Sequence, residues 1–205
     1  MHSVSASLDQ LQARLRRLHA SLASTSTLEI PVFQSPRLSG AGTFTVEFTD
    51  GRSAAEMENV LATLVANVAS LKDHLKEWCV TQNLAFPGDG LIDSDLSVGL
   101  IHDLWNRDKH GALSRPRSGH RPLIQDVHQS LGVEPIDGPG SSIEGRFDPE
   151  TGETRVVAGP NTKLSLVIDG EIVDESGTKL GGVLETCAKA LDSWETTMAA
   201  CGVPR

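Results

Sequence analysis

The chain has 205 residues, 39% of them hydrophobic, and a formal net charge of −9. This length is sufficient to bury a core within a single domain. The acidic balance excludes nucleic-acid binding by the protein surface as a whole, so any contact with phosphate groups must be local.

The first expected element is an amphipathic helix near the beginning of the chain. Apolar side chains recur there in steps of three and four, at Leu8, Leu11, Leu15, Leu18 and Leu22. This is the helical period, and the stripe needs a partner to cover it. Residues 27–50 instead alternate apolar and polar positions on either side of a segment rich in Ser and Gly, which indicates two strands near 28–32 and 44–48.

A long helix is predicted over about residues 53–80. Its apolar positions step by four and three, at Met57, Leu61, Leu64, Val68, Leu71, Leu75 and Trp78. Such a seam suits either a coiled-coil-like partner or an antiparallel bundle, and its length does not choose between them. The Pro and Gly residues of 87–90 then predict a loop, with Asp93 or Ser94 as the N-cap of the next helix.

Residues 112–142 are rich in Gly, Pro, Ser and Arg and predict a loop with one short helix at about 123–131. The ranges 143–147, 154–158 and 164–168 read as strands of a meander, with turn-forming residues between the first two. A last helix is expected from about Thr178, with apolar side chains again in steps of four and three.

The sequence thus predicts an α+β fold in which an antiparallel helical bundle carries a small antiparallel sheet or meander. We expect one domain over residues 1–205, with a helical core at about 53–111 and 178–200 and β-like segments at about 27–50 and 143–168. Because isolated hairpins are rarely stable in water, the early and late β segments are expected to pair in one sheet.

The cysteines and the apolar segments bear on where the protein works. Cys79, Cys187 and Cys201 are widely spaced and form neither a disulfide framework nor a CxxC motif, so they read as core thiols. No apolar run is long enough to cross a bilayer, and no apolar signal segment is evident. We therefore expect a cytoplasmic protein that does not associate with membranes. The three tryptophans lie on apolar stripes and are interpreted as core anchors: Trp78, Trp105 and Trp194.

The strongest candidate site lies at residues 103–111. On a helix, Asp103, Asn106 and His110 share one narrow sector, and Arg107 lies beside them. A histidine, a carboxylate that could orient it, an amide and a cation are the parts of an acid/base site for a phosphate-containing substrate. The alternative is an ordinary polar helix face that ends at Gly111.

A run of cations follows the same helix. Its members are the candidate ligand-binding residues Lys109, Arg115, Arg117 and Arg121, together with Arg107. The alternative is a solvated basic loop. No metal or other cofactor is expected, because His102 and His110, like His120 and His128, are separated by eight positions rather than the four of a helical zinc pair.

The pattern DxxNxxKHG at Asp103–Gly111 follows a long amphipathic helix that ends in LKDHL, and together these features resemble uncharacterised bacterial proteins related to the HEPN superfamily. The resemblance covers about residues 53–111, under half of the chain. It implies an antiparallel helical bundle, commonly dimeric, and for many members metal-independent RNase activity in toxin–antitoxin or anti-phage systems. Arg107 is closer to His110 than the catalytic Arg is to the His of active members, so that pair is not reproduced here.

The resemblance implies RNA cleavage by the substrate's own 2′-hydroxyl group. His110 would act as general acid or base, Asp103 or Asn106 would fix its tautomer, and Arg107 with Lys109 would stabilise charge on the phosphate. We expect a homodimer, because two-fold symmetry would bury the stripes and bring two such faces together. The alternatives are a non-catalytic helical dimer that binds an anionic ligand or an acidic protein partner through its basic helix end, and a purely structural bundle.

Overall fold

The structure is a computed structural model of the chain, and it describes residues 2–22, 29–32, 37–39, 43–45, 51–136, 142–147, 149–150 and 154–204. It confirms the α+β class. Two compact units are present, one formed by residues 1–22, 58–126 and 170–205 and the other by residues 23–57 and 127–169. The prediction of a single domain stays a prediction, because a division into units does not show whether they unfold together.

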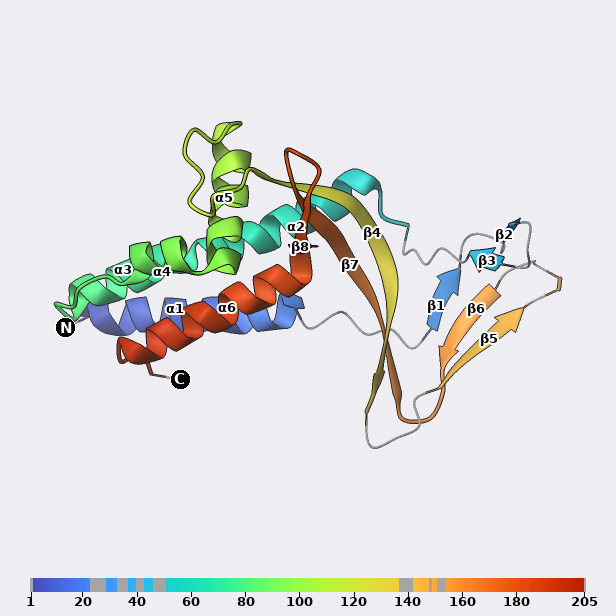
Figure 1. The fold of residues 1–205 in the computed structure, drawn as a ribbon. Coiled ribbons are helices and arrows are strands. Elements are labelled where there is room, and N and C mark those ends of the chain that lie inside the picture. Colours follow the sequence, from blue (N-terminus) through green and yellow to red (C-terminus); the bar gives the residue numbers. More distant parts are fainter. Residues whose placement is uncertain are drawn as a thin grey trace. The chain divides into compact units, whose positions relative to one another are not determined.

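Helices make up most of the first unit (Figure 1). They are α1 (His2–Leu22), α2 (Ala54–Ala69, from residue 58 on), α3 (Leu71–Thr81), α4 (Gly88–Ser94), α5 (Leu96–His110) and α6 (Val183–Ala200). α1 packs on α3, and α5 packs on both α4 and α6. The leucine stripes meet inside this unit: Leu11, Leu18, Leu61, Leu71, Leu75 and Trp194 are all at most 1% exposed. One chain therefore buries these residues by itself, whereas Leu8, Leu15, Leu22 and Met57 of the same stripes are only partly buried.

The predicted long helix at 53–80 is divided into α2 and α3 by a break at Ser70. The Ser70 hydroxyl donates to the Asn67 carbonyl at 2.9 Å and accepts from the Arg14 guanidinium. A serine hydroxyl that bonds the backbone competes with the helical pattern, which accounts for a break that a periodic apolar stripe cannot signal.

The prediction of a loop at 87–90 is wrong, because helix α4 begins at Gly88, directly after Pro87. Its glycines are poor helix formers, but Ile92 is 1% exposed, so burial in the tertiary structure outweighs local propensity. The N-cap of α5 is also one or two positions later than expected. Asp95 holds it and accepts a hydrogen bond from the Val98 amide at 3.0 Å.

The prediction of loop and short helix at 112–142 is wrong over β4 (Pro122–Pro135). β4 lies beside β7 (Thr162–Asp174), and β8 (Lys179–Gly182) completes this sheet in the order β4-β7-β8. β7 extends well beyond the predicted 164–168, and α6 starts at Val183 because β8 occupies the residues before it. β4 was not predicted because it contains turn-forming residues. Its partner strand lies about forty residues further along the chain, and local sequence patterns do not reveal such a distant pairing.

The second unit is built from strands. β1 (Glu29–Val32), β6 (Thr154–Ala158) and β5 (Ile143–Phe147) form an antiparallel sheet in the order β1-β6-β5, and the bounds of β5 and β6 agree with the prediction. An early segment thus pairs with a late one, Ile30 opposite Val156. The expected single sheet is wrong for β3 (Thr43–Thr45), which lies in a separate two-stranded sheet with β2 (Arg37–Ser39), and for the predicted third meander strand, which is part of β7 in the sheet β4-β7-β8. The rest of the predicted strand at 44–48 lies outside the described residues.

Candidate functional site

Helix α5 carries the predicted site and has defined ends. Gly111 stops it in the left-handed conformation, with φ of 74°, and donates its amide to the Arg107 carbonyl at 2.7 Å. Glycine adopts this conformation without the steric penalty of a Cβ atom. Arg107, Lys109 and His110 lie in the last turn, where a positively charged side chain interacts favourably with the negative end of the helix dipole. The ordinary role of a helix C-terminus therefore explains part of the basic composition.

Asp103 is fully buried and holds the loop that follows the helix. Its Oδ1 accepts the Arg117 amide at 3.0 Å, and its Oδ2 accepts the amide and the hydroxyl of Ser118 at 2.8 and 2.7 Å. Such charge-assisted hydrogen bonds are about twice as strong as neutral ones. The carboxylate that was expected to orient a histidine thus uses its oxygens to fix a loop.

The close approach of that loop depends on a glycine in the preceding turn of α5. A Cβ atom at Gly99 would lie 3.2 Å from the Cα of Ser118 and 3.0 Å from the carbonyl oxygen of Ile92. Gly99 therefore leaves the space in which the Ser118 backbone reaches Asp103. Backbone approach of this kind is a recognised use of glycine inside a regular element.

The pKa of Asp103 follows from two opposing effects. Burial, the largest single effect, raises it by penalising the charged form. The neighbouring His102 ring lowers it, as do hydrogen bonds from the Arg117 and Ser118 amides and the Ser118 hydroxyl, and together these effects outweigh burial. The pKa of Asp103 is therefore below its ordinary value, and the group is a carboxylate at neutral pH.

The histidine beside these groups is His102. Its Nδ1 lies 3.0 Å from Asn106 Nδ2 and 3.7 Å from Asp103 Oδ1. Asn106 and Asp103 were predicted to fix the tautomer of His110, but in the structure they contact His102. His110 is exposed, and the described part of the chain gives its ring no hydrogen bond or ion pair. The spacing of four between His102 and Asn106 was visible in the sequence and is the signal that could have identified this pair.

Acidic neighbours engage three of the predicted ligand-binding or catalytic cations. Arg107 Nη1 is 2.8 Å from Glu175 Oε1, and Arg121 Nη1 is 3.8 Å from the other oxygen of the same carboxylate. Arg117 binds Asp93 through Nε and the Asp89 carbonyl through Nη2 at 3.2 Å. Glu175, just beyond β7, is a contact that the sequence pattern could not indicate, because 68 positions separate it from Arg107.

The two remaining cations differ. Arg115 is exposed in the loop, whereas the ammonium group of Lys109 lies 5.1 Å from the centre of the Trp105 ring, within cation–π range. Trp105 is only partly buried, unlike Trp78 and Trp194 at 6% and 1% exposure. The interpretation of Trp105 as a core residue therefore holds only in part. Its ring is partly exposed and contacts the Lys109 ammonium group at the surface.

A hollow of about 380 Å³ lies at this end of α5. Trp105, Arg107 and Asp108 line it from the helix, and Leu123 and Ile124 line it from β4. Ala62 and Val65 of α2 complete the apolar part of the wall. Of the predicted site residues, Arg107 lines this depression and Lys109 lies over the ring of Trp105, which also lines it, whereas Asp103 and Asn106 face the other histidine. The β4 residues were missed because the strand itself was not predicted.

The described residues contain no group of three or more His, Cys, Asp or Glu side chains arranged to hold a metal ion. None of the helices described is long and apolar enough to pass through a bilayer. Comparison with family models, curated proteins and solved structures finds no match to this chain. The geometry of α5 and its surroundings is therefore the basis for inferring a function.

Proposed function

We propose that the end of α5 is a non-catalytic binding site for an anionic ligand. The observation that carries the proposal is the hollow lined by Trp105, in which apolar side chains adjoin Arg107 and Asp108, with the Lys109 ammonium group over the Trp105 ring. Apolar walls with a few charged groups at their edge are typical of binding sites for small ligands and peptide side chains.

An acidic protein segment with one apolar side chain is the ligand that fits best. The apolar side chain would enter the hollow against Leu123 and Ile124, and a carboxylate would bind Lys109. Arg107 already binds Glu175, and an incoming carboxylate would replace or share that partner. The net charge of −9 disfavours long polyanions, which would meet repulsion away from this local basic region.

The proposal is tested with a short synthetic peptide that contains three glutamates and one leucine. A change in tryptophan fluorescence on binding reports on Trp105, because Trp105 lines the hollow and the other two tryptophans do not. Lys109→Ala should raise the dissociation constant by about threefold to tenfold at low salt, since an exposed charge pair is modest and screened. Lys76→Ala, which removes an exposed lysine from α3, is the matched control and should change little. Equal effects of the two variants, or no binding at millimolar peptide, would contradict the proposal.

The metal-independent RNase function implied by the HEPN resemblance is the second candidate. It is supported by His110, which is exposed at the helix end beside Lys109 and is held by no hydrogen bond in the described region. An imidazole in this state is available to a substrate from outside. A homodimer of the bacterial defence or toxin–antitoxin type belongs to this candidate, since a second copy could supply the groups that Asp103 and Asn106 do not bring to His110.

Incubation with total RNA and with tRNA, in EDTA, separates the two candidates. Under the binding proposal the wild-type protein leaves RNA intact. Under the RNase candidate it cleaves RNA without metal, light scattering gives a dimeric mass, and His110→Ala abolishes cleavage without a change in helix content. Cleavage that survives His110→Ala would reject this residue as the acid or base. Cleavage by the wild type, lost in His110→Ala, would overturn the non-catalytic proposal.

A further inference from the structure

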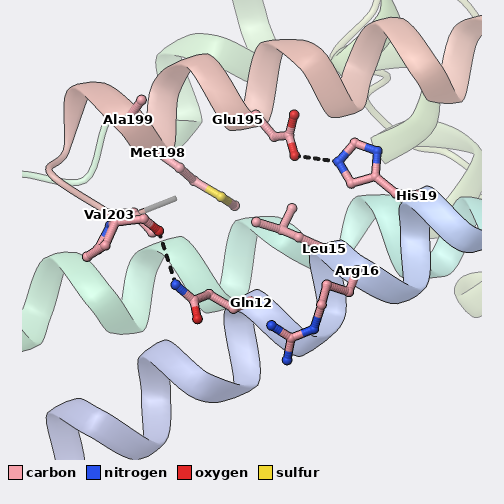
Figure 2. A pocket seen from close by; sticks show the side chains of 9 residues that line it. Gln12, Leu15, Arg16, His19, Glu195, Met198, Ala199 and Val203 are labelled. Carbon is pink, nitrogen blue, oxygen red and sulfur yellow. Dashed lines mark hydrogen bonds and ion pairs between the residues drawn. The ribbon is translucent and has the colours of Figure 1, made fainter.

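A second and larger hollow lies between α1 and α6 (Figure 2), and no residue of α5 lines it. Its volume is about 500 Å³, within the usual range for small-molecule sites. Its apolar wall is formed by Leu15 of α1, by Met198 and Ala199 of α6, and by Val203 just after α6. This hollow was not predicted, because Leu15 belongs to the apolar stripe of the first helix and was interpreted as an ordinary core residue.

Most of the polar groups around this hollow have partners within the chain. His19 Nε2 lies 2.7 Å from Glu195 Oε1, a contact that joins α1 to α6 across one end of the hollow (Figure 2). At the other end Gln12 donates through Nε2 to the Pro204 carbonyl at 3.3 Å. These two contacts bridge the walls of the hollow at its two ends.

Arg16 is the exception. Its side chain is exposed and lines the hollow from α1, and the described residues give its guanidinium no ion pair or hydrogen bond. Glu195 is the one acidic residue of the lining, and His19 already binds one of its oxygens. The hollow therefore combines an apolar wall with a positive charge that nothing in the described chain neutralises.

A second copy of the chain is a poor occupant for this surface. Residues 10–22 of α1 contain Arg14, Arg16 and Arg17 and no acidic residue. A two-fold contact through α1 would bring these like charges of two copies together, which opposes association. A small ligand with its own negative charge meets no such repulsion.

We infer that this hollow binds a small monocarboxylate with an apolar body, such as a medium-chain fatty acid or an arylalkanoic acid. The carboxylate binds the planar guanidinium of Arg16, which presents two parallel N–H donors at the spacing of its oxygens. The apolar body lies against Leu15, Met198 and Val203. This site is independent of the α5 hollow and of the function proposed for it.

Calorimetric titration with octanoate tests the inference. Octanoate should bind with a dissociation constant in the millimolar range or below, and several-fold more tightly than hexanoate, because each fully buried methylene contributes up to about fourfold. Octanamide has the same body without the charge and should bind about tenfold more weakly. No binding of octanoate at millimolar concentration, or equal binding of octanamide, would overturn the inference.

Variants locate the site. Arg16→Gln should weaken octanoate binding by about tenfold, whereas Arg17→Gln, which removes the same charge from the next exposed position, should leave it unchanged. Ala199→Phe, a change at an exposed position of α6, should fill the hollow and block binding while helix content and melting temperature stay the same. Equal losses in the two Arg variants would mean general charge attraction, and binding that survives Ala199→Phe would mean another site; either result contradicts the inference.

Discussion

Asp103→Asn is expected to lower the free energy of unfolding by about 2–3 kcal/mol. An amide presents one accepting oxygen and one NH₂ group, whereas the structure has amide donors on both carboxylate oxygens, from Arg117 on Oδ1 and from Ser118 on Oδ2. Either orientation of the asparagine therefore sets an NH₂ group against a buried donor. Urea denaturation at pH 7 measures the loss. Asp108→Asn, at an exposed position of the same helix, is the control and should change stability by no more than about 0.5 kcal/mol.

The same variant should show a defined pH dependence. The pKa of Asp103 is lower in the folded chain than in the unfolded chain, because hydrogen bonds to the carboxylate outweigh the opposing effect of burial. Its contribution to stability is therefore complete above about pH 4, the ordinary range for aspartate, and is lost as the pH falls through the folded-state pKa. The stability difference between wild type and Asp103→Asn should shrink below pH 4. A difference that grows on acidification would contradict the assigned hydrogen bonds.

Trp194→Ala is expected to cost more, about 3–5 kcal/mol, because it leaves a large cavity where a side chain is 1% exposed. Trp194 lies on α6, the helix that packs on α5, so the cavity would open in the interior of the helical unit. Thermal and urea unfolding followed by circular dichroism measure the loss. If the variant does not fold, Trp194→Phe, which retains part of the ring volume, should still unfold at lower urea concentration than the wild type.

Trp105→Ala gives the matched comparison. The Trp105 ring is partly buried and contacts the Lys109 ammonium group at the surface, so its removal should cost only about 1 kcal/mol. It should nevertheless weaken binding of the acidic peptide, since the ring lines the hollow. A loss of stability as large as that of Trp194→Ala would show that Trp105 is a core residue and would remove the basis for the binding site.

The long amphipathic helices were predictable because their information is local, whereas α4 and the break between α2 and α3 were not. Leu61, Leu64, Val68, Leu71 and Leu75 repeat with the helical period and are all buried, as the pattern requires. β4 was not predictable in this way. Its residues include Gly, Asp and Pro, and Asp126 adopts a φ of 49° that strand patterns do not allow for. The neighbouring β7 supplies the interactions that make this segment a strand, and a single sequence does not contain that pairing in readable form.

In the candidate site, too, the local features were predictable from the sequence and the long-range contacts were not. Helical spacing correctly put Asp103 and Asn106 on one side of α5, but spacing alone cannot tell which side chains a loop will cover. Asp103 is buried because residues 117–118 return to it, and Arg107 is paired because Glu175 lies beside it in space. Both contacts depend on how the chain returns after leaving the helix. Sequence reasoning therefore found the residues and misjudged their partners.

The loop after α5 is held at two points that differ greatly in their distance along the chain. Asp103 and Arg117 are 14 positions apart, whereas the Arg121 amide donates to Asp174, 53 positions away. Closing the longer segment costs about 1 kcal/mol more in chain entropy. We therefore expect the contact with Asp103 to form before the contact with Asp174, which also needs β7 in place. The sequence positions of the two aspartates would then set the order in which this loop gains its shape and its final anchorage.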